Sequence, residues 1–537
     1  MDATKPTLAA SGRGLALGAV GGVLFLTFLD TTIVSVALAD VQSTLHAGVS
    51  QLQWVVNSYA LVFASLMLGA GTLGDRFGRK RVMLAGVAVF TAGSLLGAVA
   101  PNVQTLIGAR AIMGVGAAAS EPGTLSVIRH LFPEGNVRAR ALGIWAAIAG
   151  LALALGPVIG GVLVGLGSWR NVFWFNLAAA AAVFVVTSIA VPESVDRQAA
   201  RLDLAGFTLS PAALGALTFA VIIGETSGYG APVVVALFVL AAALAMLFLL
   251  AERRSAAPVL DVRYLRRPSF SGALFVAFGA YFGIFSIFFF TALYLQVVIG
   301  YSGYRIATVF APMALAMILA SVLAGGWVGR VGARVPMTIG CLAAGLGILS
   351  TDVALRGHAD FTMLAVSLTV AGLGFGVAVV PVTSVALAVV PSEHSGMAAS
   401  ATMTSRELGT VLGVAILGSL VNGHLTADLT HRLVELGVPA SFQKIVITAV
   451  ETGQMPSGSG AASAEQAFGP TVAKVIDAAY GAFRSGLSVS LVISSLILLG
   501  SGLVAWLTIG RCTRLGRAPR AGGRQLGNES LTGSTGH

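Results

Sequence analysis

Long apolar runs recur from one end of the chain to the other, separated by short stretches that carry charge, proline or polar clusters. A bilayer core about 30 Å thick requires roughly 20 apolar residues per helix, and the runs are about that long. The pattern predicts fourteen membrane-spanning helices, at 15–39, 51–72, 82–100, 104–129, 139–165, 172–191, 204–225, 231–251, 270–294, 306–328, 336–354, 361–390, 396–422 and 484–508. We therefore expect an all-α polytopic membrane protein.

The composition agrees with this prediction. Of 537 residues, 56% are hydrophobic and 10% are charged, and the mean hydropathy is +0.89, which is too apolar for soluble domains of this length. A cleaved signal peptide does not explain the first run. That run, at 14–39, exceeds the roughly 7 to 15 residues of a signal core and contains Asp30.

The net charge of +10 arises from basic residues in short loops between apolar runs, which indicates membrane topology and not nucleic-acid binding. The loops after spans two, four, eight and ten and the span ends beside them, together with the tail at 509–537, hold 19 of the 32 lysines and arginines. Because such loops face the cytoplasm, we expect both termini to be cytoplasmic in a multi-pass protein of the plasma membrane.

Two loops are similar to each other. Residues 71–80 read G-T-L-G-D-R-F-G-R-K and residues 325–334 read G-G-W-V-G-R-V-G-A-R, so that two glycines and two cations align. Repeated halves are how many transporters build a central site that opens to each side in turn. If spans one to six match spans nine to fourteen, spans seven and eight form a linker pair.

This repeat predicts the domain organisation. The expected units are a cytoplasmic N-terminus at 1–13, a six-helix bundle at 14–191, two linker helices at 204–251, a second six-helix bundle at 270–508, and a basic cytoplasmic tail at 509–537. The second bundle includes a segment at 424–483 that is rich in glycine, serine and mixed charge. We expect it to be a flexible external loop, with a small ordered flap as the alternative.

Four motifs identify a family. They are G-T-L-G-D-R-F-G-R-K at 71–80, L-D-T-T-I-V-S-V-A-L at 29–38, R-A-I-M-G-V-G-A-A at 110–118, and Gly143 followed by G-P-V-I-G-G at 156–161. Together they resemble the fourteen-helix drug:proton antiporter family of the major facilitator superfamily, over nearly the whole chain. The sequence departs from the family pattern at Ser35, Ala39, Met113 and Ala152.

The resemblance implies a fold and an activity. The fold is two six-helix bundles with two linker helices between them, and the activity is proton-coupled export of small amphipathic or cationic compounds such as drugs and antibiotics. Gly156, Pro157, Gly160 and Gly161 match the motif that marks exporters within the superfamily, where small residues allow close helix packing and proline bends the helix.

Asp30 is the first candidate for proton coupling, because a carboxylate inside an apolar span is costly unless it is paired, hydrated or protonated. At about 1.5 Å per residue, Asp30 lies roughly 20 Å from the inner edge of its span and Arg110 roughly 10 Å from the outer edge of its own. In a core of about 30 Å they lie at similar depth, and Arg110 is the expected charge partner. The alternative is a permanent structural ion pair.

Glu121 is a second proton candidate on the span of Arg110, three turns further toward the cytoplasm. It directly precedes Pro122. In the alternative interpretation its carboxyl serves backbone groups that the proline leaves unpaired, and the two interpretations have similar weight.

The loop at 71–80 is a candidate conformational latch. Gly71 and Gly78 permit close approach and a tight turn, while a charge cluster forms between neighbouring helix ends. The residues assigned to the latch are Gly71, Asp75, Arg76, Gly78, Arg79 and Lys80. The alternative, that the cations only set topology, leaves Asp75 and the glycines unexplained.

Span nine carries an aromatic stripe that is a candidate substrate cavity, formed by Phe278, Phe282, Phe285 and Phe289. These residues follow helical spacing and would suit flat aromatic cations. Such stripes more often belong to a core or a lipid contact, and this is the favoured alternative.

Other classes of function lack residues to support them. There is no G-x-x-x-x-G-K-[ST] phosphate loop and no Cys/His cluster at metal-ligand spacing, so we expect no cofactor, no metal and no enzymatic activity. The expected partners are a small-molecule substrate, protons and the bilayer, without nucleic acid, and the protein is expected to be monomeric. The remaining alternatives are a proton symporter or facilitator for a nutrient or lipid-like metabolite, and a non-transporting receptor or scaffold.

Overall fold

The computed structural model describes residues 10–47, 49–194, 203–255, 258–301, 303–356, 360–391, 394–439, 443, 446 and 470–510, and in these ranges the regular structure is helical. The long helices of the first part are α1 (Ala10–Leu45), α2 (Val49–Phe77), α3 (Arg79–Ala98), α4 (Val103–Leu131), α5 (Gly135–Gly165), α6 (Arg170–Ala190), α7 (Leu204–Ser227) and α8 (Pro232–Arg254). The second part contains the long helices α10 (Pro268–Ser286), α12 (Gly303–Val331), α13 (Arg334–Arg356), α14 (Phe361–Val389), α15 (Ser395–Glu435) and α18 (Pro470–Thr508), and the short helix α11 (Ala292–Val297).

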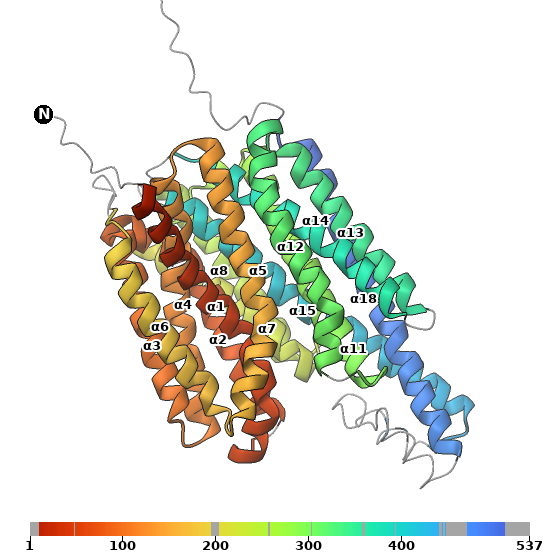
Figure 1. The fold of residues 1–537 in the computed structure, drawn as a ribbon. Coiled ribbons are helices and arrows are strands. Elements are labelled where there is room, and N and C mark those ends of the chain that lie inside the picture. Colours follow the sequence, from red (N-terminus) through yellow and green to blue (C-terminus); the bar gives the residue numbers. More distant parts are fainter. Residues whose placement is uncertain are drawn as a thin grey trace, which may run out of the picture.

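The helices form two bundles that lie side by side (Figure 1). The first half contains α1 to α6 and the second half contains α10 to α18. The bundles meet along two seams, where α2 contacts α15 and α5 contacts α12. The helix pair α7 and α8 lies beside the first seam, since α7 contacts both α2 and α15. We call the end at which α1 begins, together with the loops after α2, α4, α8 and α12, the basic end of the molecule.

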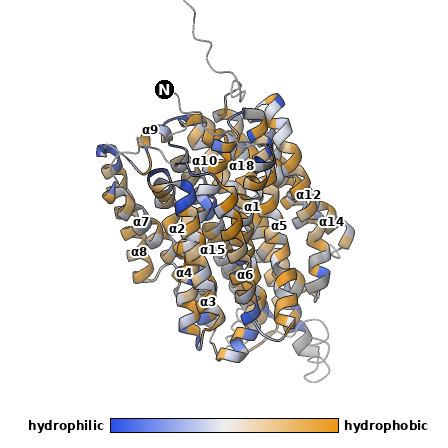
Figure 2. Cartoon of the chain, turned by 60° about the vertical axis from the view of Figure 1, so that its left-hand side comes forward, coloured by the Kyte–Doolittle hydropathy of each residue, from blue (hydrophilic) through white to orange (hydrophobic). Residues whose placement is uncertain are grey.

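The surface of the bundle suits lipid. Large apolar side chains stand exposed around its outside, among them Ile189 at 76%, Leu323 at 73% and Leu507 at 72%. Hydrophilic residues collect toward the ends of the helices, whereas the bodies are apolar (Figure 2). Exposure of these apolar side chains has no free-energy cost in lipid, whereas in water it would be strongly unfavourable. The expectation of an all-α polytopic membrane protein is confirmed.

Thirteen of the described helices are long and apolar enough to cross a membrane. The fourteenth predicted span, at 270–294, is an interrupted helix: α10 passes into a π-helical turn at Ile287–Thr291 and continues as α11. Its uninterrupted apolar part, Pro268–Ile284, is shorter than the other spans. The predicted count of fourteen spans is reached only if this interrupted helix also crosses the membrane.

The two seams are built in the same way, as the internal repeat predicts. Gly71 of α2 lies so close to α15 that an added Cβ would meet the carbonyl oxygen of Gly396. Its repeat counterpart Gly325, on α12, lies equally close to the carbonyl oxygen of Ala139 on α5. The turns that follow also match, because Gly78 has φ 107° and Gly332 has φ 85°, a region that glycine enters at no steric cost.

The segment at 424–483 differs from the flexible loop that we expected. Helix α15 continues to Glu435 and α18 begins at Pro470, so both ends of this segment are helical and project from the bundle at the lower right of Figure 1. They pack on each other through a small apolar cluster of Leu425, Leu429, Leu433, Ala478, Ala479 and Ala482. Residues 447–469 lie outside the described part of the chain.

Candidate functional site

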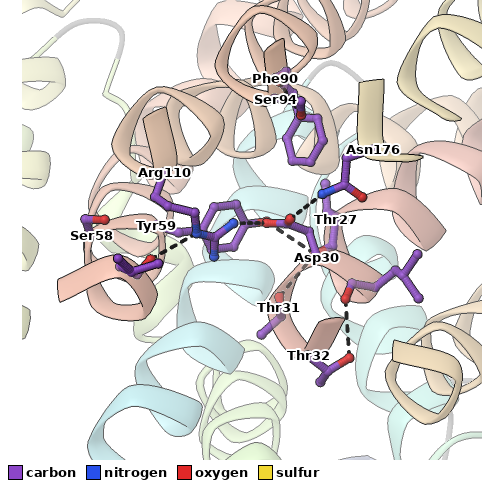
Figure 3. A network of polar contacts seen from close by, with 12 residues as sticks. Thr27, Asp30, Thr31, Thr32, Ser58, Tyr59, Phe90, Ser94, Arg110 and Asn176 are labelled. Atoms are coloured by element: carbon purple, nitrogen blue, oxygen red, sulfur yellow. Dashed lines mark hydrogen bonds and ion pairs between the residues drawn. The ribbon is translucent and has the colours of Figure 1, made fainter. Parts of the chain in front are cut away.

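Asp30 lies on α1 in the middle of the first half and is completely buried. Its Oδ2 pairs with Nη1 of Arg110 on α4, as the sequence predicted from their equal depth. Its Oδ1 accepts a hydrogen bond of 2.7 Å from Nδ2 of Asn176 on α6. Figure 3 shows the three side chains pointing toward one another. Both oxygens of the carboxylate are therefore bonded in a site closed to solvent.

Arg110 has further partners that hold it in place. Its Nε donates to the carbonyl oxygen of Val55 at 3.0 Å, and its guanidinium lies 4.4 Å from the ring centroid of Tyr59. Both partners belong to α2. A buried cation with a carboxylate, a carbonyl and an aromatic face around it has its desolvation largely offset. The ion pair consequently connects four helices of the first half.

A chain of hydrogen bonds leads from this site to Glu121. The Tyr59 hydroxyl donates to the carbonyl oxygen of Thr27 at 3.2 Å, and the Thr27 hydroxyl lies 3.2 Å from Oε2 of Glu121. Glu121 is 0% exposed, and its Oε1 has no hydrogen-bond partner among the described residues. Thr124, one turn further along α4, donates to the carbonyl oxygen of Glu121 at 2.6 Å. The two acidic candidates from the sequence thus lie within one polar network.

Residues from the second half complete this network, and the sequence pattern did not single them out as site residues. Glu407 lies on α15, which contacts α4, the helix of Glu121. It also lines a small hollow, with a cavity volume of about 10 Å³, together with Thr27, Phe28, Thr31, Phe63 and Thr410. An acidic residue in an apolar span was the signal that identified Asp30, and the same signal was available for Glu407.

Arg406 precedes Glu407 and is 1% exposed. Its Nη2 donates to the hydroxyl of Thr383 on α14, and its guanidinium lies 5.1 Å from the ring of Trp145 and 5.3 Å from that of Tyr281. Trp145 belongs to the first half and Tyr281 to the second. This cation therefore lies at the contact between the halves, beside the two glutamates.

The latch candidates lie at the basic end of the α2–α15 seam. Asp75 accepts hydrogen bonds from Nε and Nη2 of Arg79 at 3.0 and 2.8 Å, and its carboxylate lies against Gly396. Arg79 Nη2 also donates to Oγ of Ser395 at 2.8 Å. The charge cluster of one half is therefore attached to the first turn of α15 in the other half.

The other members of the latch have different surroundings. Lys80 donates from Nζ to the carbonyl oxygen of Ser188 at 2.6 Å, within its own half. Arg76 is exposed, and its guanidinium lies 5.5 Å from the ring of Phe77. Gly78 forms the turn before α3. The structure thus brings Gly71, Asp75 and Arg79 to the second half, whereas Lys80 bonds within the first half.

The glycines of the exporter motif have separate surroundings. Gly156 and Gly160 pack against Thr32, Ile33 and Val36 of α1, whereas Gly161 faces open space. Two of the three glycines thus hold α5 against the helix that carries Asp30. The side chain of Pro157 lies outside the described part.

The aromatic stripe is only partly described, and its described members belong to helix packing. Phe282 is 3% exposed within the core, and Phe278 packs beside it with 5.8 Å between ring centroids. Gly409 and Gly413 of α15 contact the backbone of these two residues. The side chains of Phe285 and Phe289 lie outside the described part. For Phe278 and Phe282 the structure favours the alternative of core packing over a substrate cavity.

The helices are apolar on the outside and enclose buried charged side chains, and the two halves are related by a repeat. These features define a multi-pass membrane protein of the transporter class. The family description Major Facilitator Superfamily matches residues 20–414. The chain belongs to this superfamily.

Relatives and solved structures agree with that assignment. The chain is 37% identical to "Multidrug resistance protein Stp" of Mycobacterium tuberculosis (strain CDC 1551 / Oshkosh), over 81% of each chain. It is 35% identical to "Methylenomycin A resistance protein" of Bacillus subtilis (strain 168), over 77% of this chain and 87% of that one. The solved proton:xylose symporter XylE superposes with a TM-score of 0.62 at 14% identity, covering 94% and 97% of the two chains, and shows the fold.

Proposed function

We propose that this protein is a proton-coupled antiporter that exports small amphipathic or cationic compounds, drugs and antibiotics among them, across the plasma membrane by alternating access. Relatives that are 37% and 35% identical carry names of drug and antibiotic resistance, which supports the export of such compounds. We further propose fourteen spans in a monomer whose termini are both cytoplasmic.

The buried pair of Asp30 and Arg110 is the observation that carries this proposal. A carboxylate that is 0% exposed within a membrane bundle takes or loses a proton only when the structure around it changes. Protonation removes the charge that holds Arg110, so the proton and the arrangement of α1 and α4 are coupled. Asp30 is accordingly the proposed proton carrier and Arg110 its charge partner, with the loop at 71–80 as the latch.

The closed contacts at the basic end support alternating access. Both seams contain a glycine that touches a backbone carbonyl of the other half, and the bond from Arg79 to Ser395 lies at the same end. If the basic end faces the cytoplasm, as its cations indicate, the cytoplasmic side is closed in this structure. Separation of these contacts would open it.

Transport in vesicles tests the proposal. Purified protein is reconstituted with an internal pH dye, a proton gradient is imposed, and movement of ethidium is followed for the native chain and for Asp30→Asn. We expect the native protein to move ethidium against its gradient while protons flow down theirs, and the variant to lose proton-driven accumulation.

Asn171→Ala is a matched control, because Asn171 donates its amide within its own half to Leu163 and is remote from Asp30 in sequence and hydrogen bonding. Equal accumulation by the native chain and Asp30→Asn would remove Asp30 as the carrier. If the native chain moves neither ethidium nor a panel of other amphipathic compounds, with no proton flux, the export function is wrong.

The cysteines allow a test of orientation. Cys341 is buried at 0% exposure, and Cys512 belongs to the basic tail. In intact cells we expect a membrane-impermeant maleimide to leave Cys512 unlabelled and to label it after permeabilisation. Labelling in intact cells would place the tail outside and contradict the proposed topology.

A further inference from the structure

The connection between α8 and α10 lies at the basic end of the molecule. Its described part is residues 258–267, which include the short helix α9 (Val262–Leu265). The start of this part is bound to α8, because the two carboxylate oxygens of Glu252 accept from the backbone nitrogens of Val259 and Leu260 at 3.2 and 3.1 Å. Val259 is also buried, at 2% exposure. Residues 258–267 are therefore fixed to the helix pair α7 and α8.

The same residues also reach the second half. The backbone nitrogen of Asp261 donates to Sδ of Met397 at 3.3 Å, and Nη1 of Arg267 donates to the carbonyl oxygen of Val389 at 3.1 Å. Met397 lies in the first turn of α15, two residues after Ser395, which binds the charge cluster of the first half. Residues 258–267 consequently hold the helix turn at which the basic end is closed.

The carboxylates of this region are occupied by backbone nitrogens. Asp203 accepts from Gly206 at 2.8 Å, Asp261 accepts from Arg263 at 2.9 Å, and Glu252 has the two bonds given above. Five exposed arginines outnumber these three carboxylates, and they are Arg253, Arg254, Arg263, Arg266 and Arg267.

These five arginines differ in their partners. Arg263 forms an ion pair with Asp261 at 2.8 Å, and Arg267 binds Val389. Arg253, Arg254 and Arg266 have no ion pair or hydrogen bond through their side chains within the described part of the chain. The region thus presents a net positive charge whose partner lies outside this polypeptide.

Helix α8 adds an apolar surface beside these cations. Its long-helix neighbour is α7, and its side chains Met246 and Leu250 are exposed. Together with Arg253 they fall at positions i, i+4 and i+7 and share one face of the helix. That face passes from apolar side chains to a guanidinium at the end of the span, which is the order of acyl chain and phosphate in an anionic lipid.

The alternative is that these arginines only set topology. The positive-inside rule accounts for cations at this place, but it does not require the bonds from residues 258–267 to α14 and α15. A soluble acidic protein would match the charge and would leave the apolar face of α8, which lies within the span, without a role. A lipid matches both.

We propose that Arg253, Arg254 and Arg266 bind the phosphate headgroup of anionic lipids, with an acyl chain along Met246 and Leu250, and that the bound lipid stabilises closure of the basic end by holding residues 258–267 against α15. The assignment of this lipid to the cytoplasmic leaflet rests on the proposed orientation, whereas the binding does not.

Native mass spectrometry of the full-length protein tests the binding. Phosphatidylglycerol and zwitterionic phosphatidylcholine with the same acyl chains are compared. We expect the native chain to prefer phosphatidylglycerol, and the triple variant Arg253→Gln, Arg254→Gln and Arg266→Gln to lower this preference by about a hundredfold. Because the three side chains bond to no described residue, the variant removes no contact of the fold.

Two controls identify the ligand. The triple variant Arg514→Gln, Arg517→Gln and Arg520→Gln removes the same charge from the basic tail and should keep the preference. Free glycerol phosphate should not displace phosphatidylglycerol, because it lacks the acyl chain. Equal loss in the two triple variants would show attraction by net charge alone, and displacement by glycerol phosphate would show a site for a soluble phosphate; either result contradicts the proposal.

Spin-label distances test the link to closure. Labels at Arg81 and Arg330, both exposed at the basic end of different halves, are placed in a Cys512→Ser background in nanodiscs with and without phosphatidylglycerol. The lipid should reduce the population at longer distance in the native chain and have no effect in the triple variant of residues 253, 254 and 266. Glu252→Ala, which frees the start of 258–267, should still bind the lipid and lose the distance response.

The outcomes separate binding from closure. No preference for phosphatidylglycerol in the native chain would overturn the whole proposal and leave the arginines to topology or to an acidic protein. Preferential binding without any change in distance would overturn the effect on closure and leave the lipid site standing. Neither measurement involves transport, so a failure here is distinct from a failure of the proposed export.

Discussion

Arg79 and Ser395 lie 316 positions apart in the chain, yet Nη2 of Arg79 donates to Oγ of Ser395 at 2.8 Å. Arg79 follows the turn at Gly78, and Ser395 begins α15. The same guanidinium binds Asp75, whose carboxylate lies at the first turn of α15, where a helix favours negative charge. The bond therefore joins the charge cluster of the first half to a helix end of the second, and it must break when the halves separate at this end.

Ser395→Ala should shift the molecule toward opening at the basic end. Loss of a hydrogen bond to a charged group costs about 1.5 kcal/mol, which is about tenfold in the closed-to-open ratio. Spin labels at Arg81 and Arg263, whose side chains are 77% and 87% exposed, would report it as a population at longer distance. Thr308→Ala, which removes a bond within one helix, is the control. Identical distance distributions would show that the bond does not hold the closed state.

Asp30→Asn should destabilise the first half, because it leaves Arg110 buried at 1% exposure without its negative partner. Removal of one member of a buried pair costs about 3–5 kcal/mol. Thermal unfolding of the purified protein measures this loss. The double variant Asp30→Asn with Arg110→Gln should be more stable than Asp30→Asn alone, yet inactive in proton-driven transport. Additive losses in the double variant would mean that the two residues are not energetically coupled.

Gly156→Ala and Gly161→Ala should have opposite effects although both replace a glycine in the same helix. At Gly156 the added methyl would lie 2.8 Å from Thr32 Cβ and 3.1 Å from the nitrogen of Ile33. We expect a loss of about 1–3 kcal/mol from overpacking. At Gly161 nothing lies within 4 Å, so alanine should be neutral or stabilise the helix by up to about 1 kcal/mol. Equal unfolding temperatures for the two variants would refute the close approach of α1 and α5.

Leu429→Ala should loosen the projecting ends of α15 and α18 and leave the bundle intact. Leu429 is 0% exposed in the small cluster, and truncation of a buried leucine costs about 2–5 kcal/mol. Amide hydrogen exchange should accelerate within 424–435 and 474–483 alone. Val434→Ala, at a residue that is 61% exposed, should leave exchange unchanged. Unchanged exchange in Leu429→Ala would mean that the two helix ends do not support each other.

Much of the fold follows from the sequence, because the length of an apolar run is set by the bilayer and not by neighbouring helices. The predicted spans correspond to helices in the structure, and the repeat of Gly71 and Gly325 reappears as two matching seams. The projecting helix ends were missed because their composition resembles that of a loop. Leu425, Leu429 and Leu433 recur every fourth residue, which was the available signal.

The site was predictable only in part, for a physical reason. The rise per residue fixes depth, so the sequence alone is enough to pair Asp30 with Arg110. Depth does not fix which face of a helix meets which neighbour. Asn176 and Glu407 were therefore not predicted, although each is a polar residue in an apolar helix. The role of the phenylalanine stripe could not be predicted for the same reason, since its spacing indicates a face but not what that face contacts.

The matching seams make the chain comparable to a dimer. In a symmetric dimer one contact occurs twice, and here Gly71 against α15 and Gly325 against α5 are the two occurrences, joined in one polypeptide. The copies are unequal, because the positions of Asp75 and Arg79 are occupied by Gly329 and Ala333 in the second copy. A homodimer cannot alter one copy of its contact alone. In this single chain the Asp75–Arg79 cluster occurs at the α2–α15 seam and its two positions in the α5–α12 seam carry no charge, so the two seams need not separate at the same cost.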